Sequence, residues 1–283
     1  MNDRIINRLL PRIDEAFLNA DRKKMKRSKN IRLIPDLKHR VGGKTSYAEW
    51  AHVIGIFQTI MYQILNKKTG NDILDVGCGT GLLGISSEPF TADNGSYTGI
   101  DVMSNDIDFC KKHYTSGNYQ FIHFDVINPT YADKQSQVLK PWPIEDDSMD
   151  LVTALSVWTH LNEEHALYYF TEIKRVLKKG GKAIITFFYL DEHYTASLKK
   201  RTDAEGRFHS SNQNLWIFDK KAYESGEWLT TAWVKNPEDA IAVTETAMKR
   251  MLEKSGLTLI ETFPGNWKEI PGIYFQDILI FEK

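Results

Sequence analysis

Residues 73–84 have the sequence ILDVGCGTGLLG, a short apolar run with one carboxylate, followed by four glycines within eight positions. Glycine inside a helix or strand costs about 0.5–1 kcal/mol relative to alanine, so such a cluster needs a local reason. Either the chain turns through a positive φ, or a ligand comes close to the backbone. The stretch therefore predicts a strand that leads into a tight, ligand-approachable loop.

From residue 71 onward, β-rich runs alternate with helical or loop stretches. The predicted strands lie at 72–76, 97–102, 119–124, 149–155 and 182–188. Residues 163–177 have apolar positions at a 3.6-residue period, and the glycines of KKGGK follow where a helix C-terminus favours them. This alternation predicts a parallel sheet with helices on both faces.

The remaining segments do not follow this alternation. Residues 46–65 have the spacing of an amphipathic helix, and 188–236 is an aromatic-rich stretch that we expect to lie over the carboxyl edge of the sheet. A helix at about 237–254 and an antiparallel strand pair complete the prediction. We therefore divide the chain into a basic arm with a helical lid (1–70), the core (71–187), a substrate-cap insertion (188–236) and a C-terminal part that completes the sheet (237–283).

Composition excludes several classes of protein. The 36 basic and 37 acidic residues nearly cancel, so the whole chain gives no polyanion-binding signal. Two cysteines rule out a disulfide framework, and neither a signal-peptide pattern nor a membrane-span pattern occurs. We expect a cytoplasmic protein. Residues 21–40 carry nine Lys or Arg and two Asp, which predicts a solvated helix face or mobile arm, or else a site for RNA or an acidic substrate.

The glycine spacing separates two classes of nucleotide cofactor. A dinucleotide fingerprint requires G-x-G-x-x-G, but Leu82 stands where its third glycine belongs. The stretch Asp75-Val76-Gly77-Cys78-Gly79-Thr80-Gly81 instead resembles the first motif of class I, Rossmann-like S-adenosylmethionine (SAM)-dependent methyltransferases, acidic-x-G-x-G-x-G. The resemblance covers about residues 71–187 and implies a doubly wound, seven-stranded, mostly parallel sheet with an antiparallel C-terminal strand.

The resemblance also implies roles for individual residues. Asp75 would face the aminoacyl end of SAM, Asp101 would take both ribose hydroxyls, and Asp125 would accept from the adenine amino group. A carboxylate suits the ribose because charge-assisted hydrogen bonds are roughly twice as strong as neutral ones. The other implied cofactor contacts are Gly77, Cys78, Gly79, Gly81, Val102, Met103, Val126 and Ser156. Cys78 itself is expected to be a small packing residue.

The acceptor side is predicted from the stretch beyond the fourth strand. His160 is the only near-neutral titrating group there, so it is the candidate general base, although it could instead orient the loop or cap the next helix. Trp158, Tyr47 and Trp50 are candidates to border the acceptor, with packing of the helix as the alternative for the last two. No metal-ligand spacing is present, so we expect no metal.

These features favour a SAM-dependent O-methyltransferase that acts on a small molecule such as a natural product or sugar and releases S-adenosylhomocysteine. No N/D-P-P-Y/F motif follows the fourth strand, which disfavours methylation of base or amide nitrogens. We expect neither a membrane nor a nucleic acid as partner. The alternatives are an RNA or protein methyltransferase that uses the basic arm, and a non-catalytic SAM-binding module.

Overall fold

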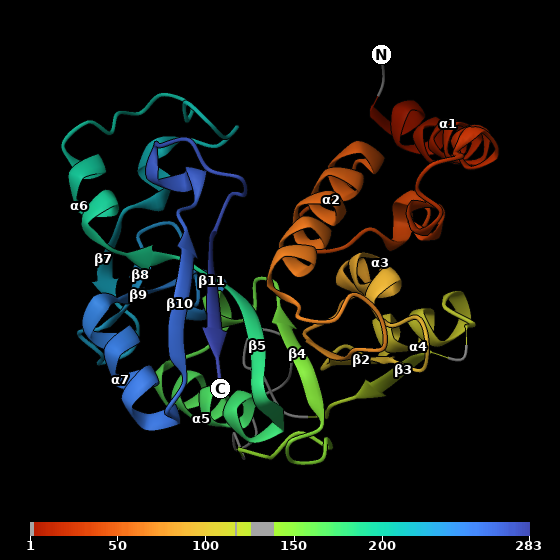
Figure 1. Ribbon diagram of the computed structural model, residues 1–283. Coiled ribbons are helices and arrows are strands. Elements are labelled where there is room, and N and C mark those ends of the chain that lie inside the picture. Colours follow the sequence, from red (N-terminus) through yellow and green to blue (C-terminus); the bar gives the residue numbers. More distant parts are fainter. Residues whose placement is uncertain (1–2, 117, 126–138) are drawn as a thin grey trace.

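The computed structural model describes residues 3–116, 118–125 and 139–283, with side chains from residue 9 onward. Within these residues seven strands form one sheet in the order β10-β11-β5-β4-β1-β2-β3, and only β11 runs antiparallel to its neighbours (Figure 1). The predicted doubly wound fold is therefore confirmed.

The parallel part of the sheet is formed by the predicted strands, with small shifts at their ends, except that β5 begins well before the predicted residue 182. They are β1 (Asp72–Val76), β2 (Ser96–Asp101), β3 (Tyr119–His123), β4 (Met149–Ala154) and β5 (Leu177–Phe187). The helices that connect or flank them are α3 (Leu82–Ser87), α4 (Ser104–His113) and α5 (Glu163–Val176). Because all of these strands are parallel, their carboxyl ends share one edge.

The glycines after α5 are not its cap, which corrects the prediction. The helix ends at Val176, and Leu177 is already extended. Gly180 has a φ of +75° and lies within β5, where its N–H donates to the Lys283 carbonyl. At Gly181 the constraint is space, because a Cβ there would lie 2.8 Å from the Lys178 carbonyl oxygen. The glycines therefore shape the start of the strand.

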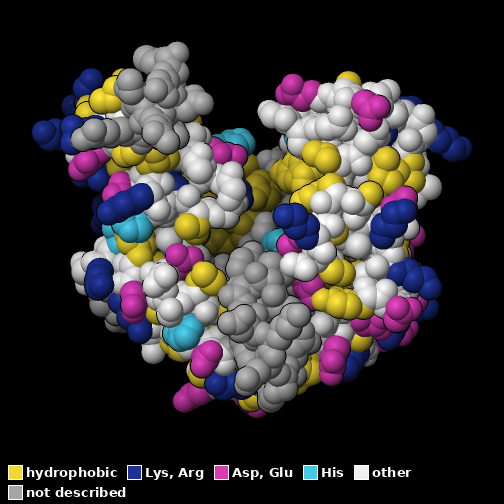
Figure 2. Space-filling model, turned by 180° about the vertical axis from the view of Figure 1, so that it is seen from behind, with side chains coloured by type: hydrophobic (Ala, Val, Ile, Leu, Met, Phe, Trp, Pro, Cys, Tyr) yellow, Lys and Arg dark blue, Asp and Glu magenta, His cyan; other side chains and the backbone are white. Residues whose placement is uncertain are grey.

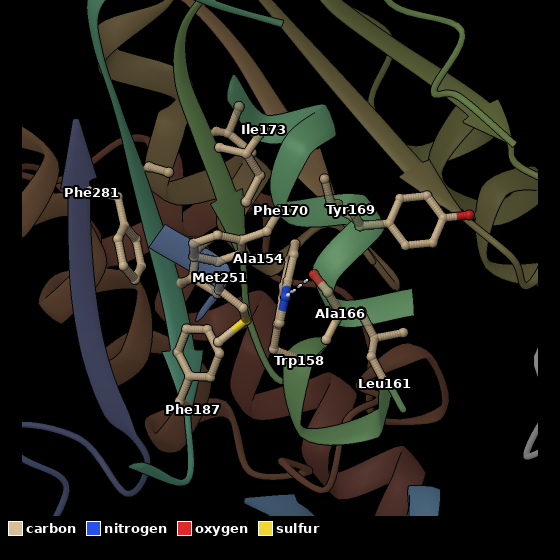
Figure 3. Close-up of a cluster of buried hydrophobic side chains, with 14 of the residues drawn as sticks. Ala154, Trp158, Leu161, Ala166, Tyr169, Phe170, Ile173, Phe187, Met251 and Phe281 are labelled. Carbon is tan, nitrogen blue, oxygen red and sulfur yellow. Dashed lines mark hydrogen bonds between the residues drawn. The ribbon is translucent and has the colours of Figure 1, made fainter. Parts of the chain in front are cut away.

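Neighbouring residues of the central strands point to opposite faces of the sheet, and both faces are buried. Ile73 packs with the apolar side of α2 (Tyr47–Ile64), whereas Leu74 packs with α5 and α7 (Glu245–Ser255). This two-sided burial explains why the strands are almost continuously apolar. Figure 3 shows part of the α5 side, where Trp158 lies among Phe170, Phe187 and Met251.

The N-terminal arm is folded rather than extended. It comprises α1 (Asp3–Lys24), two 3₁₀ turns (Asn30–Leu33 and Leu37–His39) and then α2, whose first turn is capped by the Ser46 side chain. Arg40 is buried and forms a two-pronged ion pair with Asp14 of α1, at 3.0 and 2.8 Å. Part of the basic stretch therefore holds the arm together. The helix predicted at 46–65 is confirmed.

The segment after β5 forms a second, four-stranded sheet in the order β6-β9-β8-β7. Its elements are β6 (Tyr189–Leu190), α6 (Glu192–Leu198), β7 (Phe218–Lys221), β8 (Trp228–Thr231) and β9 (Ile241–Thr244). The helix predicted to begin at 237 begins instead at Glu245, because residues 241–244 pair with β8 and β6. The inserted unit thus extends past residue 236. The strand pair β10 (Thr258–Phe263) and β11 (Asp277–Glu282) closes the main sheet.

A buried ionic network joins the inserted unit to the main sheet. The Lys268 ammonium is fully buried and lies 2.8 Å from Asp191, the N-cap of α6, and 2.7 Å from Asp277 at the start of β11. Asp277 also accepts from Trp267 Nε1 and from the N–H groups of Gly265 and Tyr189. The inserted unit is therefore anchored to the sheet through a desolvated cation.

None of the helices in the described ranges is both long and apolar enough to cross a membrane. Figure 2 shows the surface hollowed between two lobes, with apolar side chains in the hollow. One lobe carries the N-terminal helices and the other carries the inserted unit (Figure 1).

Candidate cofactor site

The glycine loop directly follows β1 and turns through positive φ values, one of the two possibilities that the glycine cluster raised. Gly77, Gly79 and Gly81 have φ values of +68°, +49° and +91°, a region that side chains other than glycine rarely adopt. A Cβ on Gly81 would also lie 2.6 Å from the Tyr114 ring, which is buried under the loop. The glycines are therefore required both by the turn and by close packing.

The Asp101 carboxylate, at the end of β2, pins this loop. One oxygen accepts from Gly79 N at 2.7 Å, and the other accepts from Met103 N at 2.8 Å. Burial raises the pKa of Asp101, while these backbone N–H groups act in the opposite direction. Asp101 therefore organises the loop, and the lone pairs that backbone N–H groups do not occupy remain for a further hydroxyl donor.

Asp75 lies beneath the loop on β1. Its two oxygens accept from Tyr97 Oη at 2.7 Å and from Thr153 Oγ1 at 2.8 Å. The side chain is almost fully buried, and this desolvation raises its pKa to about 7, although the two hydroxyl donors oppose the shift. A carboxyl group in this state can change its charge near neutral pH when a cation approaches.

A groove runs between the loop, the end of β4 and the segment before α2. Its lining includes Asp75, Gly77, Gly79, Lys44, Trp50 and Ser156. The enclosed part measures about 80 Å³, below the roughly 300 Å³ of a complete small-molecule site. Ligand binding there would therefore also need the adjoining open surface, on which Met103 and Asp125 are exposed.

A larger cavity of about 420 Å³ lies at the opposite edge of the sheet. Its lysines are largely paired: Lys67 and Lys178 contact Asp150, and Lys178 also contacts Asp72. Because these charges are compensated and the glycine loop is at the other edge, this cavity is not the candidate site.

The segment before α2 is fastened to the glycine loop. Thr80 Oγ1 donates to the His39 carbonyl at 2.6 Å, and Trp50 Nε1 donates to the Lys44 carbonyl at 2.8 Å. Trp50 therefore borders the groove with a side chain that is buried, and its role beside the acceptor stays a prediction. Tyr47 does not line this groove. Its hydroxyl contacts Met25 Sδ, and its ring lies 5.8 Å from the Arg40 guanidinium carbon.

Sequence reasoning missed two residues at this site. Lys44 brings a cation to the groove wall, where its ammonium donates to the Gly42 carbonyl. Gln276 accepts from Ser156 Oγ at 2.8 Å, across 120 positions of sequence. The only signal for Lys44 was its place after two glycines, both with φ of +76°, and no local signal identifies Gln276.

The residues after β4 divide between the groove and the core. Ser156 lines the groove with a φ of +60°, and its N–H donates to Thr186 Oγ1. Such a conformation costs about 1–3 kcal/mol and often marks a functional site. Trp158 is fully buried against Phe170 and Phe187, so the expectation that it borders the acceptor cavity is corrected.

His160 lies at the junction with the inserted unit. Its Nδ1 donates to the Glu238 carbonyl at 2.6 Å, which leaves Nε2 as the basic nitrogen. Burial lowers the pKa of His160, which favours the neutral form of the imidazole. His160 is not among the groove-lining residues. Its role as general base therefore stays a prediction beside the alternative that it orients the loop.

The other predicted cofactor residues take the following places. Val102 and Met103 follow Asp101, and Asp125 is exposed two residues beyond His123, the register partner of Asp101. Val126 lies outside the described residues. Cys78 is buried under the loop against Gly99, and Cys110 is buried with its thiol near the Gly79 carbonyl, as expected of packing residues.

The sheet order, the glycine loop and the carboxylates that end β1 and β2 define the core as a class I, Rossmann-like methyltransferase domain. Residues 74–185 match the family described as a methyltransferase domain. This region contains all of the predicted cofactor residues, from Asp75 to Ser156.

Individual methyltransferases also resemble part of this chain. An O-methyltransferase of Pyrenophora dematioidea is 31% identical over 133 residues, which are 46% of this chain and 45% of the relative. The ubiquinone biosynthesis O-methyltransferase of Pasteurella multocida (strain Pm70) is 26% identical over 141 residues, 45% of this chain and 57% of the relative. The chain thus spans about half the length of these curated relatives.

A solved protein of Pyrococcus horikoshii OT3 shares the fold. It superimposes with a TM-score of 0.51 and 17% identity, over 83% of this chain and 91% of that protein.

Proposed function

We propose that the protein is a SAM-dependent methyltransferase that transfers a methyl group to a hydroxyl of a small-molecule acceptor. The observation that carries the proposal is the positive-φ glycine loop. The Asp101 carboxylate holds this loop in place, and the buried Asp75 carboxyl group lies beneath it. The names of the curated O-methyltransferase relatives support a hydroxyl acceptor, and the hollow between the two lobes in Figure 2 leaves room for a small molecule.

The residues at the groove fit the charges of SAM. When bound, SAM supplies a sulfonium methyl group that is already activated for in-line displacement. Asp75 offers a carboxylate for the ammonium, Lys44 a cation for the carboxylate, and Asp101 acceptor lone pairs for the ribose hydroxyls. The protein's contribution is to orient donor and acceptor, which can lower the barrier by several kcal/mol.

No cluster of three or more potential metal ligands occurs in the described ranges. The chemistry proposed for this chain uses hydrogen bonds, charges and positioning. The acceptor proton would pass to a side chain or to water.

Turnover with methyl-labelled SAM tests the proposal. The purified protein would be given a panel of phenols, carboxylic acids and sugars, and the transfer of label and the release of S-adenosylhomocysteine would be measured. We expect transfer to at least one hydroxyl acceptor. Binding of SAM without turnover would favour the non-catalytic alternative, and transfer to RNA or protein only would favour the macromolecular one.

The affinity for SAM should depend on pH through Asp75. Below its pKa of about 7 the side chain is neutral, and pairing with the ammonium requires that it lose its proton. We therefore expect the affinity to rise about tenfold per pH unit between about pH 5 and 7, and to level off above. Calorimetry across this range measures the effect. Asp75→Asn is the control and should bind weakly with no such slope. The same slope in this variant would contradict the assignment.

Replacing His160 with glutamine separates its two roles. As a general base, His160 should contribute about 10²–10⁴-fold to kcat, with little change in the Kd for SAM. The loss should shrink at high pH, where more of the acceptor is already ionised. A purely orienting role would instead lower the melting temperature and leave the pH profile of kcat unchanged. Single-turnover rates and thermal melts distinguish these outcomes.

A further inference from the structure

Helix α1 packs against the rest of the protein along one side only. Leu18 is 2% exposed, and Asp14 on the same side forms the ion pair with buried Arg40. The other large apolar side chains are solvent-facing: Leu9, Leu10, Ile13 and Phe17 are 46%, 48%, 50% and 70% exposed. The helix therefore has an apolar face that the fold does not cover.

These four side chains form a continuous stripe. Leu9, Ile13 and Phe17 follow one another at intervals of four residues, which places them on one helical face, and Leu10 lies beside them. No other α-helix in the described ranges exposes more than one large apolar side chain. The stripe is therefore distinct from the scattered apolar residues of an ordinary surface.

Exposed cations accompany the stripe. Arg12 lies to one side of it on the same stretch of helix, and Lys23, Lys24, Lys26 and Arg27 lie at the end of the helix and just after it. Neither Arg12 nor these four forms an ion pair with any described residue, whereas Arg22 donates to the Arg32 and Ile34 carbonyls. The helix thus combines an unpaired basic segment with an uncovered apolar face.

We propose that α1 is a membrane-surface anchor that binds an anionic phospholipid bilayer, with Leu9, Leu10, Ile13 and Phe17 among the acyl chains and the cations against the headgroups. An amphipathic helix with an apolar stripe and Lys or Arg beside it has the chemistry of an interfacial helix. Each Lys or Arg near an anionic surface strengthens the attraction to it. This anchor lies on the surface and does not span the bilayer, and it revises the expectation from the sequence that no membrane is a partner.

Two other occupants fit the observations less well. A stable protein–protein interface takes about 20–30 residues a side, whereas the stripe offers four, so a second copy of the chain would gain little from it. RNA would use the cations but would leave a stripe of leucine, isoleucine and phenylalanine in water. A bilayer uses both features.

Sedimentation with vesicles tests the proposal on the full chain. We expect binding to vesicles that contain phosphatidylglycerol, and much weaker binding to vesicles of phosphatidylcholine alone. Ile13→Ser combined with Phe17→Ser should weaken binding at least about tenfold, because two apolar side chains lose their burial. Leu198→Ser, an exposed leucine on α6, is the matched control and should bind like the unaltered protein.

Several results would overturn the proposal. Equal binding to both kinds of vesicle would do so, as would vesicle binding by the Ile13/Phe17 variant that matches that of the unaltered protein. A salt-dependent affinity for single-stranded RNA that exceeds the affinity for vesicles would favour RNA as the partner. A dimer of the unaltered protein in ultracentrifugation that the variant does not form would favour a second copy of the chain. Calorimetry with SAM on the same variant keeps the two proposals apart. If the variant loses vesicle binding but keeps its affinity for SAM, the substitutions act on the anchor and not on the cofactor site.

Discussion

Lys268→Met should lower the free energy of unfolding by about 3–5 kcal/mol, because it leaves buried carboxylates without their cation. Lys268 and Asp277 are both fully buried, and Lys268 joins Asp277 to Asp191 at hydrogen-bond distance. Burial already raises the pKa of Asp277, and the Lys268 ammonium opposes that shift. Without it, Asp277 would have to take up a proton or remain charged in an apolar surrounding.

Urea unfolding followed by tryptophan fluorescence measures this loss. The matched control is Lys178→Met, which removes a lysine that also contacts two aspartates, Asp72 and Asp150, but remains partly exposed. We expect the control to cost about 1 kcal/mol or less, because solvent screens exposed pairs. If both variants lose the same free energy of unfolding, burial of the Lys268 network does not determine how much it contributes to stability.

Asp101→Ala should weaken SAM binding by about 1.5–3 kcal/mol, the scale of a hydrogen bond to a charged group. The reason is twofold. The substitution removes the predicted ribose acceptor, and it frees the Gly79 and Met103 N–H groups, which lie 2.7 and 2.8 Å from the carboxylate oxygens. A loosened loop would also hold the methyl donor less well, so kcat should fall with affinity.

Calorimetry with SAM gives the change in affinity, and Asp106→Ala provides the control. Asp106 is a partly buried carboxylate on α4. Burial raises its pKa most, and the negative charge of nearby Asp101 raises it further. Its removal should leave the affinity within about twofold, since it does not bind the loop. If Asp101→Ala binds SAM as tightly as the unaltered protein, the ribose assignment is wrong.

Local patterns predicted the core of the fold well. The runs that became β1, β2 and β4 are short and almost wholly buried, as is typical of parallel strands covered on both faces. The helix at 46–65 was equally clear, because α2 has one apolar side and a serine cap. The glycine loop was predictable from spacing alone, since positive φ is inexpensive only for glycine.

Where tertiary contacts outweigh local preference, the same reasoning failed. Asn236-Pro237-Glu238-Asp239 has the pattern of a helix start and does form a short capped turn. Yet residues 241–244 pair with β8, so the helix is delayed to Glu245. Trp158 follows β4 where acceptor residues are expected, but a large apolar ring gains more from burial in the core.

What the sequence alone determined is the α/β alternation, the position of the glycine loop and the carboxylates Asp75 and Asp101, because periodicity, glycine conformation and strand ends are local properties. Only the tertiary structure decided which distant groups meet: Lys44 at the groove, Gln276 on Ser156, and Lys268 between Asp191 and Asp277. Such contacts depend on how strands and loops far apart in sequence pack, and the desolvation that shifts the pKa of Asp75 exists only once they have packed.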